Sequence, residues 1–461
     1  MPNTLKKITL IVFALSSACI NTIPSNAKND GFPLFSTLEP HSFTYTQTKQ
    51  QLHGFHTDEK PLDRFQFSIS PFGQNADKGQ DINNNEANLG NLSSPDGRKW
   101  AMLGLLNGNL PNNIVFAVES EKLEAARVAL GINPLPINEQ TVIDPAENFG
   151  FFDIPATYKK RGIRFDMTMR ILKGFGLSLQ TGFSDICHTT TAFTNSTGTT
   201  ELSPPGFANV TVANINRYLM NEFKTIMKEL GLNIENFHKT SLEDVHLGLF
   251  LRHAFKINYE KDKHEWPHFL LIPFGKLTYI AAASRERKGN EAFSIPFGNN
   301  GHNAINFTSG INLDFKKTIE MGFEWGITHF LPKKFNKYRV PTSELQSGIF
   351  PFATSVRVSP GFSWHWGLKM NARHFVDKLS IYFQWVVLEH KDDNIEILDK
   401  DPAFLPDVLK KRSTWKSQVA NIGLNYDISE NISLGFFWQA PLSQRNSYRS
   451  TTVMVGINVI G

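Results

Sequence analysis

The sequence predicts an all-β fold, a closed antiparallel transmembrane β-barrel of about twelve strands, on the basis of three observations. Long segments alternate apolar and polar residues with a period of two, which is typical of β-strands. Each segment runs for roughly ten residues, enough to cross a bilayer when tilted, whereas strands of soluble sheets usually have about five or six. Short turns and long polar connections alternate along the chain, which puts all the short turns at one end of the sheet.

The N-terminus has the pattern of a signal peptide over residues 1–27. Two lysines precede an apolar run from Ile8 to Ile20, and Ser25-Asn26-Ala27 forms a small-x-small cleavage site. We therefore expect an exported protein whose mature chain begins near Lys28, with an N-terminal periplasmic segment over residues 28–62. After the signal peptide, no apolar run reaches the length of a membrane-spanning helix.

Cysteine content and charge exclude two classes of protein. Loss of Cys19 with the signal peptide leaves only Cys187, so we expect no intrachain disulfide framework. Alternatively, Cys19 is the acylated residue of a lipoprotein, since the small residues Ser17-Ala18 precede it. The formal charge of +4 falls to +2 when Lys6 and Lys7 are removed, which argues against a nucleic-acid partner.

The strands are expected in the following order. A short strand at 65–70 comes first, and the clearest hairpin covers 161–183, where Ile163 and Phe165 alternate with Arg164 and Asp166. This hairpin breaks at Lys173-Gly174, and the alternation resumes at once on the other side. The same pattern recurs over nine further segments, 245–258, 268–282, 305–315, 319–328, 362–371, 379–387, 422–428, 432–438 and 453–459. The total of about twelve is even, as in single-chain bacterial barrels.

Aromatic residues gather near both ends of these strands. Four tryptophans fall near the long connections, and a second set falls near the short turns: Trp325, Trp364, Trp366 and Trp438, and then Phe175, Tyr259, Phe315, Phe375 and Tyr426. Aromatic rings favour the two lipid interfaces. The two sets therefore indicate that the strands span a bilayer.

With these features the sequence resembles the porin-like outer-membrane β-barrel proteins of Gram-negative bacteria, over residues 160–461 and the strand at 63–71. The resemblance implies a barrel domain over 63–461, an outer-membrane location, insertion by the outer-membrane assembly machinery, and contact with membrane lipid and lipopolysaccharide. A secreted β-sandwich is the alternative reading of the alternation, with the apolar face turned to a core. The long strands and the two aromatic belts favour the barrel.

Two connections, 74–160 and 184–242, are long enough to carry structure of their own. We expect a short helix from Ser120 to Gly131 in the first, and a longer helix ending at Gly231 in the second. Either helix folds into or over the barrel mouth, or it rests on other outer loops. A further alternative adds a hairpin at 99–106 and 113–120, which would make about fourteen strands.

The polar face of the strands is expected to line the lumen. The acidic residues lie on one hairpin and several basic residues lie on strands distant in order, which would create a field across the bore and favour weak anion selectivity. The alternative is that the charges pair and fill a narrow barrel. The predicted pore-lining residues are Arg164, Asp166, Arg170, Arg252, Lys256, Lys276, Asp314, Glu320, Glu324, His365, Lys369, Arg373 and Asp427.

These observations predict an outer-membrane channel for passive diffusion of small polar solutes or ions. The alternative is a surface adhesin or structural barrel with a plugged lumen. We expect no enzyme, cofactor or metal site, because the histidines show no spacing typical of a metal site or a Ser–His pair. Cys187 and His188 are adjacent, so their side chains would point apart on a strand.

Overall fold

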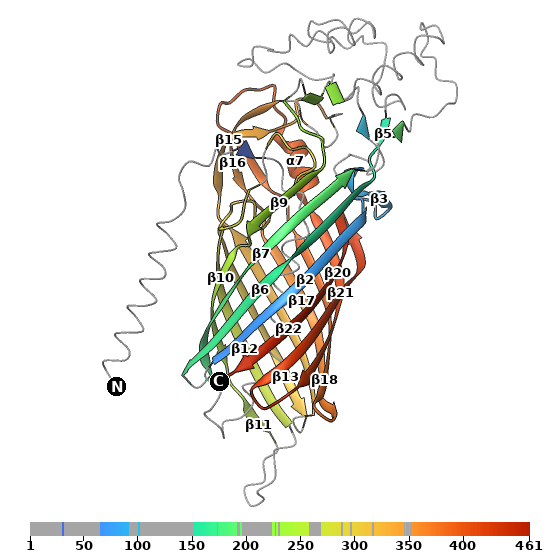
Figure 1. The fold of residues 1–461 in the computed structure, drawn as a ribbon. Helices are drawn as coiled ribbons and strands as arrows, with labels where there is room; N and C mark the ends of the chain where they lie inside the picture. The colour runs from blue at the N-terminus through green and yellow to red at the C-terminus, as the bar shows by residue number, and fades with distance from the viewer. Residues whose placement is uncertain are drawn as a thin grey trace, which may run out of the picture.

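The computed structural model is a β-barrel with additional structure at one end (Figure 1). The predicted signal peptide, the helix expected at 120–131 and Tyr259 lie outside the described residues. The structure describes residues 30–31, 65–91, 100–101, 151–172, 174–190, 194–195, 224–225, 227–228, 231–257, 269–286, 289–295, 297–315, 318–344, 346, 350 and 352–461.

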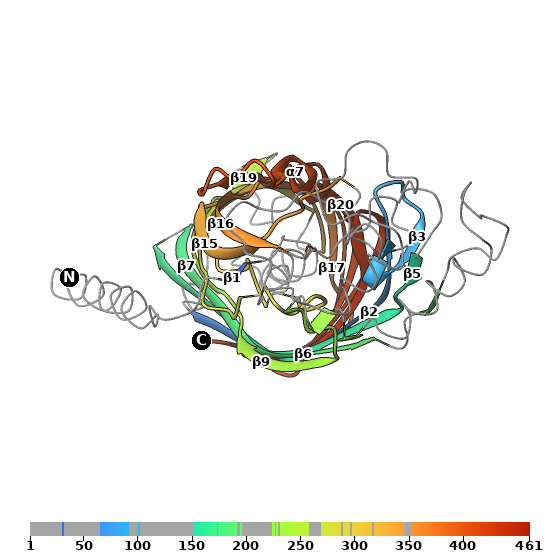
Figure 2. The ribbon, with the colours of Figure 1, turned by 90° about the horizontal axis from the view of Figure 1, so that it is seen from above.

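Twelve antiparallel strands close into a ring, as predicted, and Figure 2 shows this ring from above. Within the ring β10 pairs with both β7 and β12, and β22 pairs with β2 to form the seam. At the lower end of the seam, the amides of Phe65 and Gly461 each donate to the other's carbonyl at 2.9 Å. The ring consists of β2 (Phe65–Gln80), β6 (Ala156–Leu172), β7 (Phe175–Thr190), β10 (Val245–Arg252), β12 (Phe269–Ala281), β13 (Ala304–Phe315), β14 (Ile319–Phe330), β17 (Ser363–Val376), β18 (Leu379–His390), β20 (Trp415–Asp427), β21 (Ile432–Arg445) and β22 (Ser447–Ile460).

Two alternatives from the sequence are wrong. The closed ring rules out a β-sandwich, and it closes without the extra hairpin that would have given about fourteen strands. Within that proposed hairpin, β4 (Trp100–Ala101) instead pairs with β5 (Phe151–Asp153), which pairs in turn with β8 (Thr194–Asn195) in a separate sheet. Three further short strands extend the barrel sheet: β3 (Glu86–Asn88), β9 (Phe237–Leu242) and β11 (Phe255–Ile257).

Several strands run further than predicted at the end opposite the short turns. β2 continues to Gln80 and β7 to Thr190, and β21 and β22 meet at Asn446 alone, so the long connection expected after residue 438 is instead strand. Asn446 adopts the left-handed conformation, with φ of 51°, that a tight turn requires. The predicted boundaries were short because these extensions lack an apolar face.

The helix predicted to stop at Gly231 does so. Gly231 has φ of +67°, the Leu232 amide donates to the Met227 carbonyl at 2.8 Å, and the Gly231 amide donates to the Lys228 carbonyl at 3.0 Å. These two bonds form a Schellman motif, which requires the left-handed residue that glycine provides. Among the described residues, no helix is both long and apolar enough to cross a membrane.

A separate unit, here named the outer cap, lies at the end of the barrel opposite the short turns (Figures 1 and 2). It contains β15 (Lys333–Arg339), β16 (Ala353–Ser359), β19 (Asn394–Ile397) and α7 (Pro406–Ser413). From the segment expected on the periplasmic side, β1 (Asp30–Gly31) pairs in parallel with β15 in this cap. The buried core of the outer cap is apolar and comprises Phe335, Tyr338, Val340, Phe350, Phe352, Val356, Val358, Ile395, Phe404 and Leu409.

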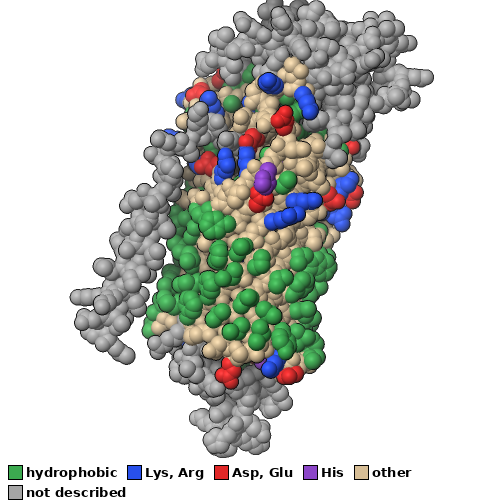
Figure 3. All heavy atoms as spheres, in the orientation of Figure 1, with side chains coloured by type: hydrophobic (Ala, Val, Ile, Leu, Met, Phe, Trp, Pro, Cys, Tyr) green, Lys and Arg blue, Asp and Glu red, His purple; other side chains and the backbone are tan. Residues whose placement is uncertain are grey.

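The outside of the barrel carries a band of exposed apolar side chains, with charged side chains above it (Figure 3). Leu249 is 44% exposed, Phe323 44% and Val455 51%, although all three are large and apolar. Such exposure over so wide a surface would be unfavourable in water and is expected in lipid. We name this surface the lipid-facing band.

Trp364 and Trp366 stand near the upper end of β17, as predicted, but the other two tryptophans of the predicted belt lie within their strands. Trp325 and Trp438 are outward and exposed, at 45% and 38%, but each stands near the middle of its strand because the strand continues above the lipid-facing band. At the other end, Phe315, Phe375 and Tyr426 are exposed near the short turns.

Candidate functional site: the polar lumen

The inner wall of the barrel is mostly polar, with buried apolar side chains such as Val386, Phe437 and Met454 among the polar ones, and its side chains have little exposed surface. Alternate residues of every strand point inward, so closing the ring turns the whole polar face to the lumen. Of the predicted pore-lining residues, Lys256 is exposed, Arg170, Arg252, Lys276, Arg373 and Asp427 are half-buried, and Arg164, Asp166, Asp314, Glu320, Glu324, His365 and Lys369 are buried.

Six of these residues form a cluster in the lower lumen, near the short turns. Arg373 forms ion pairs with Asp314, at 3.2 Å, and with Glu320. Lys369 Nζ lies 3.6 Å from a Glu324 carboxylate oxygen. Arg252 interacts electrostatically with Glu320, Arg373 and Asp314. We name Arg252, Asp314, Glu320, Glu324, Lys369 and Arg373 the lower charge cluster; these six charges sum to zero.

Gly322 allows Lys369 to lie flat against the wall. A Cβ atom at Gly322 would stand 2.5 Å from Lys369 Cε and 2.5 Å from Asn312 Oδ1, closer than real Cβ contacts. Lys369 comes from β17, yet its Nζ lies 4.6 Å from the centre of the Phe274 ring on β12, a cation–π contact. Because Gly322 on β14 has no side chain, Lys369 from β17 can extend past β14 and β13 and reach Phe274 on β12.

A row of amide side chains continues the lower charge cluster around the wall. Gln384 Nε2 donates to Glu324 Oε1 at 2.8 Å, Asn421 Nδ2 donates to Gln384 Oε1 at 3.1 Å, and Gln439 Nε2 donates to Asn421 Oδ1 at 3.0 Å. All four side chains are buried. Gln384 and Asn421 each donate one of these bonds and accept another, so the row fixes the orientation of both amides.

A second group of charges, higher in the lumen, contains two residues that the sequence did not reveal. Glu243 accepts from Lys160 Nζ at 2.6 Å and from Arg164 Nε at 3.1 Å, and none of the three has exposed surface. The Arg164 guanidinium also lies 4.1 Å from the centre of the Phe72 ring. Glu243 lies between β9 and β10, where it interrupts the alternation of apolar and polar residues. That interruption is the one sequence feature that could have marked Glu243 as a site residue.

The predicted separation of positive and negative charges across the bore is wrong. Arg252 lies close to the acidic hairpin because only β12 separates β10 from β13, and Arg164 has its own partner in Glu243. The geometry instead agrees with the alternative, in which charges pair along the wall. Paired charges give a weaker net field than separated ones.

Some buried polar atoms in the lower lumen have no protein partner. Both amide atoms of Asn371, which has no exposed surface, lack a hydrogen bond within the described part of the chain, as does Arg252 Nη2. Leaving such groups unsatisfied is costly, so buried polar atoms of this kind usually bind water. The lower lumen is therefore suited to hold water molecules.

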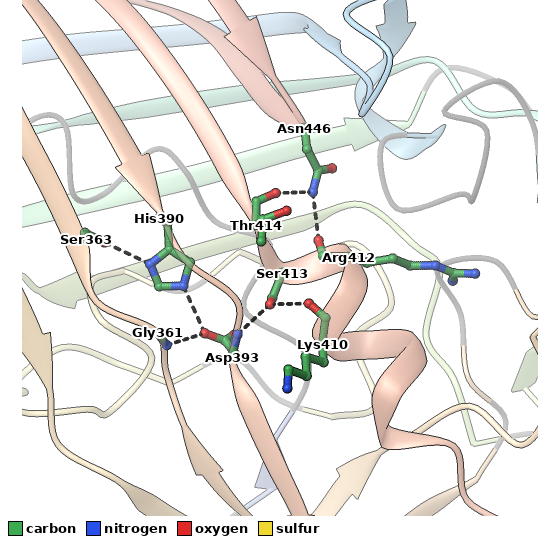
Figure 4. A network of polar contacts seen from close by, with 9 residues as sticks. All are labelled: Gly361, Ser363, His390, Asp393, Lys410, Arg412, Ser413, Thr414 and Asn446. Atoms are coloured by element: carbon green, nitrogen blue, oxygen red, sulfur yellow. Dashed lines mark hydrogen bonds and ion pairs between the residues drawn. The ribbon is translucent and has the colours of Figure 1, made fainter.

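A Ser–His–Asp chain, which the sequence did not indicate, lies at the upper rim (Figure 4). Ser363 Oγ lies 2.8 Å from His390 Nδ1, and His390 Nε2 lies 2.9 Å from Asp393 Oδ1. Ser363 and His390 are direct neighbours across β17 and β18, although 27 residues separate them in sequence. All three side chains are buried, and the His390 ring stacks on Trp415 at 5.6 Å.

This chain connects the barrel rim to the outer cap. Asp393 Oδ1 also accepts from the Gly361 amide at 2.9 Å, and the Asp393 amide donates to Ser413 Oγ at 2.7 Å. Ser413 ends α7, and Asn446 Nδ2 donates to the Arg412 and Thr414 carbonyls beside it (Figure 4). The exposed carbonyls at the end of a helix need such donors. The arrangement fits a structural role in holding α7.

Comparisons with known proteins give only distant likenesses. No protein-family model matches the sequence, and a search of curated proteins finds no match. An outer-membrane channel from Pseudomonas putida F1 is similar with a TM-score of 0.45 and 7% identity, over 87% of this chain and 97% of that one. The translocator domain of the Neisseria meningitidis autotransporter NalP has a TM-score of 0.34 and 8% identity, over 90% and 94%. The NanC porin has a TM-score of 0.30 and 8% identity, over 65% and 93%.

These likenesses are too distant to bear on activity. What the structure itself contains is a closed ring of twelve antiparallel strands with an apolar band outside and a mostly polar inner wall. By its fold, the chain is a β-barrel of the outer-membrane type.

Proposed function

We propose that the chain forms a narrow outer-membrane channel for the passive diffusion of small polar solutes or ions. The observation that supports this proposal is the polar inner wall, which the closed ring separates from the lipid-facing band. Charged and amide side chains form hydrogen bonds with water and polar solutes, whereas an apolar solute would leave these groups without partners. The proposed activity includes no covalent step.

The lower charge cluster is the proposed constriction. Barrels of eight strands are filled by side chains and those of sixteen leave an open channel, so twelve strands give an intermediate bore. Side chains of the cluster reach across neighbouring strands, and those of Asp314 and Glu320 are almost fully buried. We therefore expect a small conductance. Because the charges of the cluster balance, we also expect little preference between cations and anions.

The test is the single-channel current of the full chain, isolated from outer membranes, in a planar lipid bilayer. We expect small, discrete current steps. Glu320→Gln should shift the reversal potential in a salt gradient toward anions, and Arg373→Gln should shift it toward cations. Glu430→Gln, on an exposed turn at the lower rim, is the control and should leave the reversal potential unchanged. Equal selectivity in all three variants would remove the cluster from the conduction path.

A closed structural or adhesive barrel is the second candidate. The burial of the inward side chains and the size of the outer cap favour it. Insertion into the bilayer without any current, in the parent chain and in both charge variants, would support this candidate and overturn the channel.

A further inference from the structure

Two basic residues on the outside of the barrel stand just above the lipid-facing band. Lys159 and Arg161 belong to β6, and both side chains are exposed. The next outward residue down the strand is Ile163, which is 44% exposed and lies opposite Phe183, 56% exposed. Phe183 packs edge-on against Phe165, with ring centroids 6.4 Å apart. We name Lys159 and Arg161 the basic pair.

The position of the basic pair matches the headgroup layer of the outer leaflet. Alternate residues of a strand lie about 7 Å apart, so Arg161 sits one such step above the last apolar residue and Lys159 one step higher. Lipid chains that cover Ile163 and Phe183 would carry their headgroups at this height. The pair therefore adjoins a surface that already faces lipid.

Neither member of the basic pair has an ion-pair partner among the residues that the structure describes. Arg161 lies opposite Asp185 in the register with β7, but that carboxylate is directed to β9. There it contacts His238 Nε2 at 2.7 Å and accepts from Thr240 Oγ1 at 3.2 Å. Lys159 lies opposite Cys187 on one side and Asn75 on the other, neither of which carries a carboxylate.

Two other cations at this rim differ in this respect. Arg449 on β22 pairs with Glu86 at 3.2 Å, and Lys391 pairs with Glu389. Beside Arg161, Gly73 on β2 leaves open space outside the sheet, since a Cβ atom there would meet nothing within 4 Å. The basic pair thus combines unpaired positive charge with room for a ligand.

We propose that Lys159 and Arg161 bind the phosphate of a phosphorylated outer-leaflet lipid whose acyl chains lie on Ile163 and Phe183. A guanidinium binds phosphate through two parallel hydrogen bonds, and an ammonium adds a second charge-assisted contact. Basic side chains at the edge of an apolar belt are a recurrent form of recognition for anionic headgroups. This inference does not depend on the proposed channel activity.

The test measures binding of bisphosphorylated lipid A to the full chain in detergent, by native mass spectrometry. The double variant Lys159→Gln and Arg161→Gln should weaken binding by at least tenfold. Lys334→Gln removes an exposed lysine from the outer cap, away from the lipid-facing band, and should leave binding unchanged. Equal binding by the double variant and the parent would overturn the proposal. Heat-dependent gel mobility confirms that each variant is folded.

Two further binding measurements, with phosphatidylethanolamine and with inorganic phosphate, identify the source of the phosphate. Phosphatidylethanolamine, whose headgroup has no net charge, should bind more weakly than lipid A and should be insensitive to the double variant. Inorganic phosphate at millimolar concentration should not displace lipid A, because it lacks acyl chains. Displacement by inorganic phosphate would show an anion site without lipid recognition and would overturn the lipid part of the proposal. Phe183→Ser should weaken lipid A binding without changing the folded state.

Discussion

The barrel and the outer cap use the same kinds of residue in opposite ways. In the barrel, large apolar side chains such as Phe323 are exposed and polar side chains such as Gln384 are buried. In the cap, Phe335 and Phe350 are buried without any exposed surface, and Lys334 and Arg357 are exposed. The cap therefore has a core of the kind found in water-soluble domains.

This difference shows that the surroundings determine which face of a strand turns inward. Alternation of apolar and polar residues is present in both regions, so it does not by itself distinguish a lipid-facing surface from a core. Strand length and closure distinguish them. Eleven of the twelve ring strands have 12 to 17 residues and β10 has eight, whereas the cap strands β15 and β16 have seven residues each and pack against a helix.

The largest expected effect contrasts one phenylalanine from each region. Phe335→Ala should destabilise the outer cap by about 3–5 kcal/mol, because it leaves a cavity in a closed core. Phe323→Ala should cost much less, since lipid chains can fill the space at a side chain that is 44% exposed. Limited proteolysis in detergent, with cleavage in the cap followed separately from barrel unfolding, checks both values. Equal losses would contradict the assignment of the two surfaces.

A charged substitution sharpens the same contrast. Leu249 and Leu398 are similarly exposed, at 44% and 37%, but only Leu249 lies in the lipid-facing band. Leu249→Arg should cost about 2–4 kcal/mol in a lipid bilayer. Leu398→Arg, in the cap, should stay within about 0.5 kcal/mol. The measurement is equilibrium folding into lipid vesicles in urea; a comparable loss for both would show that the band does not face lipid.

Acid should destabilise the cap side of the molecule through His302. The pKa of His302 is lowered from 6.5 to about 4 in total, mainly by burial; the hydrogen bond to the Leu331 carbonyl and nearby Asp393 oppose the shift, and nearby Lys333 adds to it. The unfolded chain then binds the proton more readily, so stability falls as the pH drops from 6.5 toward 4, by about 3 kcal/mol in full.

The measurement is protease resistance of the cap at pH 7.5, 5.5 and 4.5. His302→Gln should reduce the loss at low pH, whereas His374→Gln, an exposed histidine at the lower rim, should leave it unchanged. Identical pH profiles for the parent and His302→Gln would contradict the prediction.

The smallest effect compares a turn at each rim. Asn446→Gly keeps the left-handed backbone but removes two hydrogen bonds to the end of α7, at 2.7 and 2.8 Å, and should cost about 1–2 kcal/mol. Asn431→Gly, in the lower turn between β20 and β21, removes no comparable contact and should cost a few tenths of that. The measurement is the thermal unfolding of both variants in detergent. Equal losses of stability would show that Asn446 does not stabilise the end of α7.

The sequence predicts the membrane part of the fold well because lipid imposes a simple pattern. Every residue that meets lipid must be apolar and its neighbour faces the lumen, so the strands from Ile305 to Phe315 and from Ile319 to Ile327 were found nearly to the residue. Above the lipid this constraint ends. The upper part of β2, residues 71–80, shows no regular alternation of apolar and polar residues. Its strand structure follows from pairing with β6 and β22.

The candidate site was predictable as a surface but not as a set of contacts. Alternation places Arg373 and Asp314 on the inner face, yet their ion pair joins β17 to β13 across the intervening β14. That contact depends on the stagger of the strands, which residue patterns do not specify. Ser363 and His390 escaped notice for a related reason, since cross-strand neighbours are separated in sequence by the length of a hairpin.

The seam between β2 and β22 has a consequence for how the barrel forms. Its two strands come from opposite ends of the barrel sequence, so bringing them together closes the longest loop in the molecule. Every other neighbouring pair in the ring is closer in sequence. The hairpins can therefore assemble first, and the seam is expected to be the last and slowest step of folding, with an open sheet as its precursor. Until that step, the edges of β2 and β22 are free to pair with another protein, and a barrel with a weakened seam would be held in that open state.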